Sequence, residues 1–477
     1  MIPLVKPLEI VTQYSSVYRE LLTDADWTRL ARYVSGLMVS PNKTVDGINK
    51  LFVLDAEDQS SLNRFLTSGR FDVSKMNRAR VDWLQTCPQT AFKGMEGEKG
   101  VLILDDTLLR HYGSHFEKSA WLYDHVGKSY AWSHNLVNLH YSDDLTDYPV
   151  DFRLWEPADL DRVEKAMLSA GFKFGEDKLR LKTENPAQWQ SYLLKTYHRK
   201  RKQHGGKGME AACRTKVGEA RQLLADFFSH RPGQDLPIAF DHWYTCAELC
   251  AFIEKDLKRA YVGTLAEGDL LLIGPQKAPV TCGAFVKQLL GQHKEALQKG
   301  QKPVFEKVGI HYKGQKENYW AYCQTHQVKT LGRQRLVVSF SKEDLSDDEP
   351  KIYVSNRLHW RSGGILRIRR HRWPIEVYHE EAKAEGLDQY QVRQFDALHK
   401  HIACVCVAYS MLKRVQFDPE LLNKLTWSPE KKSGSLAFWR RVMTANALLG
   451  FVEWIVREMP DKPLCHGLMQ KLAQVYS

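Results

Sequence analysis

Residues 371–383 read HRWPIEVYHEEAK and hold one carboxylate, Glu376, between two cations, Arg372 and Lys383. A helix turns about 100° per residue, so residues seven apart share a face within about 20°, and Glu376 and Lys383 project together. Pro374 is tolerated in a first helical turn, which predicts that a helix begins beside it and leaves Arg372 just ahead. Such a pattern suits a site that handles a metal and phosphates, although alone it favours an ordinary solvated salt-bridge face.

Two other stretches place acids directly after short apolar runs. Residues 101–104 (VLIL) precede Asp105 and Asp106, and residues 236–240 (LPIAF) precede Asp241. Continuous apolar runs of this length predict buried central strands, and carboxylates at strand ends emerge at the sheet edge, where ligands usually bind. Asp105 and Asp106 point to opposite faces if the strand continues, so both remain candidates.

Further short runs predict more strands around these two. Residues 136–141 and 149–155 alternate like paired strands, and residues 335–340 and 351–354 are strand-like again. Residues 266–334 are rich in Lys, Gly and Gln with short alternating runs, which predicts a β-rich insertion. The sequence therefore predicts a sheet that is interrupted before the helix of the opening stretch.

The helical patterns at both ends complete the predicted organisation. We expect a helical N-terminal DNA-binding domain at 1–92, a core in two parts at 93–265 and 335–412, the insertion at 266–334, and a helical C-terminal domain at 413–477. From pattern alone, the N-terminal part is as compatible with a plain helical scaffold. The arginines we expect on its exposed faces are Arg64, Arg70, Arg78 and Arg80.

A basic segment, YHRKRKQHGGK at 197–207, stands apart from the acids. Its charge and glycines predict a mobile loop that grips a phosphate backbone. The residues that would do so are Arg199, Lys200, Arg201 and Lys202. A solvated loop without a role is at least as good an interpretation.

The composition is that of a globular protein with an excess of positive charge. The 477 residues, 43% of them apolar, are enough for a sizeable core, and the net charge of +11 favours a polyanionic partner, nucleic acid first. The nine cysteines are scattered without a CxxC pair, so we expect reduced thiols and no zinc site. No signal peptide is present and the longest apolar run, near 402–412, is too short for a bilayer, so we expect a soluble, intracellular protein.

Together these residues resemble the DDE transposases of bacterial insertion sequences, in the retroviral-integrase superfamily. The first acid of that family lies in a D-x-T element, matched here by Asp105 and Thr107. The second follows an apolar strand, as Asp241 does, and the third lies in a Y-x2-R-x3-E-x6-K signature, matched by the residues of the opening stretch. The resemblance covers roughly residues 55–412 and indicates the branch with this signature and a β-rich insertion.

The resemblance implies an α/β fold, with a ribonuclease-H-like core of a mixed sheet flanked by helices. It implies that Asp105, Asp241 and Glu376 are catalytic and bind Mg²⁺, for which Mn²⁺ would substitute. Arg372 and Lys383 would hold backbone phosphates. The register of the motif favours Asp105 over its neighbour and the signature glutamate over the one a turn later, Glu380.

One departure from the family lies at Arg369, where the signature has its Tyr. In the family this Tyr helps to hold the DNA end near a flipped base, so flipping in that form, and a hairpin step that uses it, are in doubt here. Arg369 is instead a candidate for a phosphate contact.

The implied function is transposition in the bacterial cytoplasm, at the nucleoid. The protein would bind the terminal inverted repeats of double-stranded DNA, act as a homodimer on two paired ends, cleave them with two metal ions and join the 3′-OH ends to target DNA. The alternatives are a DNA-binding protein derived from a transposase and a nuclease of the same fold without strand transfer. An RNA-binding scaffold would not explain three acids at these places.

Overall fold

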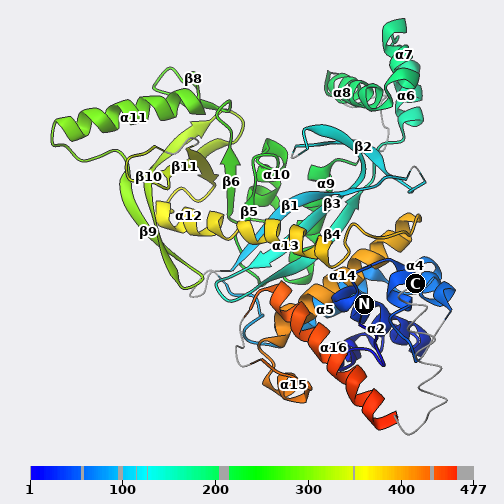
Figure 1. Ribbon diagram of the computed structural model, residues 1–477. Coiled ribbons are helices and arrows are strands. Elements are labelled where there is room, and N and C mark those ends of the chain that lie inside the picture. Colours follow the sequence, from blue (N-terminus) through cyan, green and yellow to red (C-terminus); the bar gives the residue numbers. More distant parts are fainter. Residues whose placement is uncertain are drawn as a thin grey trace.

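The computed structural model (Figure 1) describes residues 2–54, 58–94, 100–113, 115–125, 127–203, 214–346, 350–429 and 434–458. Within these ranges the protein is a mixed α/β protein built on one twelve-stranded sheet. The sheet runs in the order β2-β3-β1-β5-β6-β12-β11-β10-β7-β8, with β4 paired to β3 and β9 paired to β10. The expectation of an α/β protein with a mixed sheet is confirmed.

Helices and strands follow one another in runs, with helices at both ends of the described chain. The strands are β1 Val101–Arg110, β2 Ala120–Asp124, β3 Ser129–Ser142, β4 Asp147–Trp155, β5 Ile238–Phe240, β6 Tyr261–Leu265, β7 Leu270–Ile273, β8 Ala278–Thr281, β9 Glu306–Tyr312, β10 Gln315–Val328, β11 Gly332–Phe340 and β12 Lys351–Ser355. The helices are α1 Glu9–Tyr14, α2 Asp24–Val39, α3 Val45–Asn49, α4 Gln59–Ser68, α5 Val73–Gln85, α6 Leu160–Ser169, α7 Glu176–Glu184, α8 Pro186–Gln203, α9 Lys216–His230, α10 Ala247–Ala251, α11 Cys282–Gln298, α12 Ser362–Arg370, α13 Trp373–Ala384, α14 Phe395–Val415, α15 Pro419–Lys424 and α16 Leu436–Glu458.

The central strands bring the two acid-bearing segments together. β1 runs parallel to β5, with Leu102 beside Ile238 and Leu104 beside Phe240. β1 does not end at Leu104, as the apolar run suggested, but continues to Arg110 because it pairs with β3 along its whole length. The acids after Leu104 therefore lie inside a long strand, next to the place where β5 ends.

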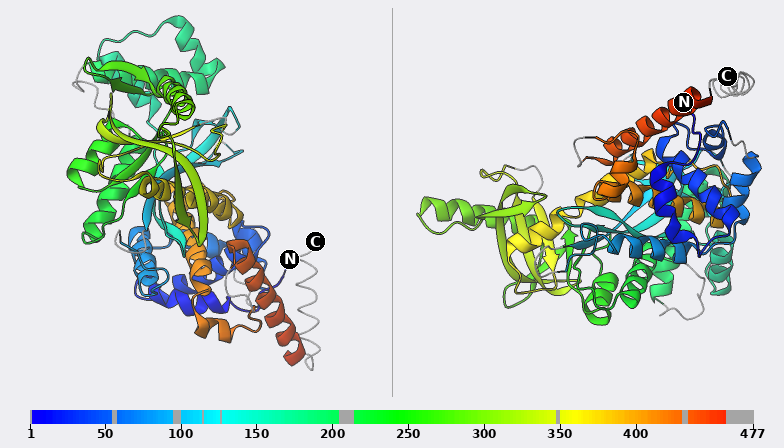
Figure 2. Two further views of the ribbon diagram at one scale, coloured as in Figure 1. Left: turned by 90° about the vertical axis from the view of Figure 1, so that its left-hand side faces the viewer. Right: turned by 90° about the horizontal axis from the view of Figure 1, so that it is seen from below.

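Helices cover both faces of this part of the sheet. Figure 2 shows the sheet between α9 and α10 on one face and α13 and α14 on the other. α9 packs on β3 and β4, whereas α13 packs on β1 and β4. Because successive side chains of a strand point to opposite faces, neighbouring residues of β1 meet different helices.

The predicted β-rich insertion is largely β, with one long helix. Helix α11 packs on one side of the strands, and its Phe285 and Leu289 share with Phe305 a hydrophobic core separate from the main one. The insertion does not form a sheet of its own, since β11 pairs with β12, and β12 pairs with β6 of the core. The core sheet and the insertion are thus continuous (Figure 1).

Helices α6 to α8 form a second, helical addition between β4 and α9. They enclose a small core that includes Val163, Trp189 and Leu193. The basic segment predicted as a loop is helical through residue 203, as the end of α8, so the prediction of a loop is wrong for that part. Residues 204–207 and the side chain of Lys202 lie outside the described residues.

The N-terminal helices share the main hydrophobic core with the C-terminal half. Leu37 of α2, Ile402 of α14 and Trp439 of α16 belong to one buried cluster. Arg80 is fully buried, and it donates to the carbonyl oxygens of Pro149 and Val150, so its predicted exposure is wrong. Within the described ranges, no helix is both long and apolar enough to cross a bilayer.

Candidate active site

The first predicted acid, Asp105, lies next to the second, Asp241. The last paired residues of the parallel strands β1 and β5 are Leu104 and Phe240. Asp105 follows Leu104 and Asp241 follows Phe240, so the two acids are neighbours. Both line a cavity of about 750 Å³. Burial, and after it the Asp241 charge, raise the pKa of Asp105 to about 8, and burial also raises the pKa of Asp241. Two carboxylates that repel each other and have lost their hydration favour the binding of a cation.

Helix α13 brings the third acid and its arginine to the same place. The helix begins at Trp373 with Pro374 in its first turn, as predicted. Arg372 precedes it, and its Nη1 lies 2.9 Å from Oδ2 of Asp105, while its Nη2 pairs with Oε1 of Glu376. The Arg372 side chain is 9% exposed, and its guanidinium bridges a strand to a helix. The structure therefore brings Arg372, Glu376 and the two aspartates together.

The neighbouring acid, Asp106, is held in a different environment on the other face. Its carboxylate accepts hydrogen bonds from Asn135 at 2.5 Å, Lys216 at 2.8 Å and Tyr244 at 2.9 Å. Burial would raise the pKa of Asp106, but the Lys216 charge and these hydrogen bonds outweigh it and lower the pKa. Asp106 is thus fully engaged within the protein, which supports Asp105 as the acid that faces α13.

The remaining predicted residues of the opening stretch lie around this cluster. Lys383 lines the same cavity, one turn beyond Glu380, which is exposed. Arg369 of α12 lies 5.5 Å from the centre of the Tyr353 ring, and its buried Nε has no hydrogen-bond partner. Burial and the adjacent Arg372 lower the pKa of Arg369. Arg369 thus lies within electrostatic range of Arg372, Glu376 and Asp241.

The basic residues of α8 are not part of this cluster. Arg199 and Arg201 are exposed, and Lys200 lies 5.9 Å from the centre of the Phe172 ring, within the helical addition. None of them lines the cavity around the aspartates. A contact between α8 and DNA would therefore lie outside the catalytic cluster.

The oxygen donors of the cluster fit a divalent cation of the Mg²⁺ type. Such an ion takes hard carboxylate oxygens and keeps several waters, so Asp105 and Asp241 suffice to begin a site. Among the described residues, no three His, Cys, Asp or Glu side chains converge on one point. Glu376, the third predicted acid, pairs with Arg372. A three-carboxylate site would require Glu376 to leave that pair.

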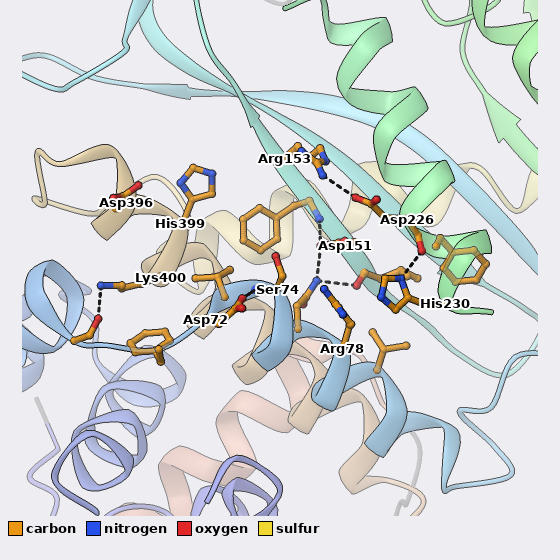
Figure 3. A pocket seen from close by; sticks show the side chains of 18 of the residues that line it. Asp72, Ser74, Arg78, Asp151, Arg153, Asp226, His230, Asp396, His399 and Lys400 are labelled. Carbon is orange, nitrogen blue, oxygen red and sulfur yellow. Dashed lines mark hydrogen bonds and ion pairs between the residues drawn. The ribbon is translucent and has the colours of Figure 1, made fainter. Parts of the chain in front are cut away.

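A larger cavity, of about 920 Å³, lies between α5, β4, α9 and α14 (Figure 3). Its charges are mixed, and several are paired with one another or with the backbone. Arg153 lies 2.7 Å from Asp226, and Lys400 donates to the carbonyl oxygen of Gly69 at 2.7 Å. None of the three predicted catalytic acids lines it. The volume of a cavity alone therefore does not identify the candidate active site.

Four residues of the site are not among the candidates that the sequence predicts. Lys216 and Asn135 reach Asp106 from α9 and β3, and no local pattern announces a contact across 110 or 29 positions of the chain. Trp243 and Tyr244, in contrast, lie within three residues of Asp241, and two aromatic residues so close to the end of an acid-ended apolar run were a local signal.

Comparison with known proteins agrees with this geometry. A family model described as DDE superfamily endonuclease matches residues 17–267, slightly more than half of the chain. The match includes both aspartates and ends before α13. No curated protein matches the chain. Members of such a family are nucleases that act on DNA and generally use divalent metals. By this match, and with its two aspartates side by side on parallel strands, the chain belongs to the DDE superfamily endonucleases.

Proposed function

We propose that this endonuclease is a transposase of the bacterial insertion-sequence type. It binds the terminal inverted repeats of its element as a homodimer, cleaves the DNA at each end and joins the 3′-OH ends to target DNA. The observation that carries the proposal is the convergence of Asp105, Asp241 and the Arg372–Glu376 pair. This grouping is the one expected from the Arg-x3-Glu-x6-Lys signature, although the family match itself stops short of α13.

The catalytic acids have distinct positions in the proposal. Asp105 and Asp241 supply carboxylate oxygens from neighbouring strands, and Glu376 supplies a third from α13. Mg²⁺ or Mn²⁺ held by them would activate the attacking oxygen and neutralise charge on the scissile phosphate. Asp105 lies within β1 and Asp241 directly after β5, so the two carboxylates are neighbours at the place where β5 ends.

The cations would position the DNA strand. Arg372 is the residue of choice for a fork-like contact with phosphate, and Lys383 offers a point charge in the same cavity. Arg372 now neutralises Asp105 and Glu376. We infer that phosphate and metal compete with this internal ion pair, so that the guanidinium is released to DNA when the carboxylates take a cation.

The test is cleavage and joining of DNA that carries the element's own ends, with Mg²⁺. We expect nicking at the ends and joined products from the unaltered protein, and neither from Asp241→Asn. Asp344→Asn, in an exposed turn after β11, is the matched control and should retain both activities.

Each other outcome selects an alternative. Specific binding to the ends without cleavage by any of the three proteins would indicate a DNA-binding derivative. Cleavage without joined products would indicate a nuclease that lacks strand transfer. Equal activity in Asp241→Asn and the unaltered protein would reject the assigned acids.

A further inference from the structure

The hairpin of β2 and β3 carries four aromatic side chains on one face. Trp121 stands opposite Trp132, and Tyr123 stands opposite Tyr130, in the antiparallel ladder. Directly opposed and alternate residues of two strands share a face, so the four rings project together. The ring centroids lie 5.8 Å apart in the Trp pair and 5.4 Å apart in the Tyr pair.

Three of these rings are open to solvent, whereas that of Trp132 is half-buried. Trp121, Tyr123 and Tyr130 are 39%, 44% and 43% exposed. None of the four belongs to a buried hydrophobic cluster of the described residues. Large aromatic surfaces left exposed in a row usually mark a binding surface.

The row of rings continues from the hairpin to the catalytic aspartates. The ring of His125 lies 5.0 Å from that of Tyr123 and 6.4 Å from that of Trp243. Trp243 is 57% exposed and lies two residues after Asp241. Tyr123, His125 and Trp243 line the same cavity as the two aspartates. We call this row the aromatic strip; it consists of Trp121, Trp132, Tyr123, Tyr130, His125 and Trp243.

Cations accompany the end of the strip that is nearest to the acids. Lys216 Nζ lies 6.0 Å from the centre of the Trp243 ring, and it lines the cavity together with Arg110 and Lys383. Rings interleaved with cations are the combination that binds single-stranded nucleic acid, since bases stack on the rings and phosphates meet the charges. Lys216 and Arg110 also pair with Asp106 and Asp124, so part of this positive charge is neutralised within the protein.

We propose that the aromatic strip binds unpaired bases of the DNA strand whose phosphate lies at Asp105 and Asp241. The preferred substrate is then a DNA end with single-stranded nucleotides beside the cleavage point. This inference rests on the proposed function, because it takes the two aspartates as the place of cleavage. Stacking is tolerant of base identity, so the strip selects unpaired DNA and not a sequence.

Fully paired DNA is a poor ligand for the strip. Its bases present only their edges in the grooves, and their flat faces are covered by neighbouring base pairs. Contacts between the protein and paired DNA would be made by the cations with phosphates. The contributions of the aromatic strip and of the cations to DNA binding can therefore be told apart by comparing paired and unpaired DNA probes.

The experiment measures the affinity of the full chain for two fluorescent probes by anisotropy, without divalent metal. One probe is oligo(dT), and the other is a fully paired duplex of the terminal repeat. In Trp243→Ala and in Tyr123→Ala we expect the affinity for oligo(dT) to fall by about tenfold, whereas that for the duplex changes by less than about twofold. Trp243→Phe should bind oligo(dT) nearly as well as the unaltered protein.

The matched control is Trp427→Ala, which removes an aromatic ring that is 44% exposed and lies away from the cavity. It should bind both probes like the unaltered protein. Unchanged oligo(dT) binding in both strip variants would overturn the proposal, and so would equal losses for the two probes. Loss of dimerisation by light scattering with unchanged oligo(dT) binding would overturn it in favour of a protein interface.

The two proposals fail separately. If the protein neither cleaves nor joins DNA and the strip variants still lose oligo(dT) binding, the strip stands and the transposase proposal fails. If cleavage and joining occur and oligo(dT) binding is unchanged in the variants, only the strip is rejected.

Discussion

At the scale of single residues, two adjacent aspartates of one strand have opposite electrostatic roles. Asp105 faces Asp241 and Arg372, and its pKa is raised. Asp106 faces Lys216 and Tyr244, and its pKa is lowered. The alternation of a strand is sufficient to separate them, because each side chain meets a different helix-covered face.

This difference predicts opposite effects of removing the two charges. Because its pKa is raised, Asp105 of the folded protein keeps its proton at pH values at which Asp105 of the unfolded chain has lost it. The stability of the metal-free protein therefore falls as the pH rises from about 4 toward 8. Asp105→Asn should therefore stabilise the metal-free protein at pH 8, and the gain should vanish near pH 4. Urea denaturation at several pH values measures this.

Asp106→Asn is the matched comparison. Because the pKa of Asp106 is lowered by folding, its ionised carboxylate stabilises the fold at pH values above the pKa that Asp106 has in the unfolded chain. This stabilisation is lost as the pH falls through the pKa that Asp106 has in the folded protein. The substitution should lower the free energy of unfolding at pH 8 by roughly 1–3 kcal/mol, because it weakens the Lys216 ion pair and two hydrogen bonds. If the two variants change stability in the same direction, the assignment of faces is wrong.

Lys383 offers a second prediction at this scale. If it holds a phosphate of the DNA end, Lys383→Ala should weaken end binding and flatten the dependence of log affinity on log salt by about one unit. Affinity measured at four salt concentrations gives that slope. Glu380→Ala, on the same helix and exposed, is the control, and it should leave the slope unchanged. An unchanged slope in Lys383→Ala would remove Lys383 from the DNA interface.

At the scale of elements, pairing partners decided what local pattern could not. β1 extends beyond its apolar run because β3 pairs with it as far as Arg110. The basic segment near residue 200 is helical because Leu193 and Tyr197 of α8 are buried against α6. Its charges thus extend from a packed helix, not from a loop.

The role of α8 in DNA binding is testable by charge reversal. Arg199→Glu together with Arg201→Glu should lower the affinity for duplex DNA by about tenfold or more at low salt and flatten the salt slope by about two units. Metal binding should not change, because α8 does not line the cavity of the aspartates. Arg180→Glu, on the exposed surface of α7, serves as control. Equal behaviour of the double variant and the control would show that α8 has no such role.

At the scale of the whole molecule, the N-terminal helices are part of the body that carries the active site. α2 packs on α14 and α16, and α5 packs on α14 and β4. Arg80 of α5 ties three regions together, since it donates to Pro149 O at 2.6 Å and to Ser410 Oγ at 2.8 Å. The proposed DNA-binding role of residues 1–92 remains a prediction. These helices would have to bind DNA while they are packed against the C-terminal helices and the sheet.

Arg80→Ala should therefore destabilise the whole protein. It removes the Arg80 hydrogen bonds to the carbonyl oxygens of Pro149 and Val150, of which the second still accepts from Asn77, and this loss should cost about 2–4 kcal/mol. Arg78→Ala, two residues away and exposed, should change the free energy of unfolding by less than about 0.5 kcal/mol. Urea unfolding of both variants measures the difference. A small effect of Arg80→Ala would mean that the N-terminal helices are coupled only weakly to the sheet.

The sequence by itself determined the elements that carry chemistry. Apolar runs before Asp105 and Asp241 predicted two central strands, and Pro374 predicted the start of α13, because burial and backbone restriction are local properties. The family resemblance is confirmed at the level of the DDE superfamily endonucleases. The narrower branch and the catalytic roles stay predictions.

Only the tertiary structure decided which groups meet. The parallel register of β1 and β5 sets Asp105 beside Asp241 across more than a hundred residues of chain, and Arg372 crosses from α13 to the same strand. The burial of Arg80 and the exposure of the aromatic strip likewise depend on partners distant in sequence. Residue type and spacing fix what a segment can become, whereas pairing and packing between distant segments fix what each side chain touches.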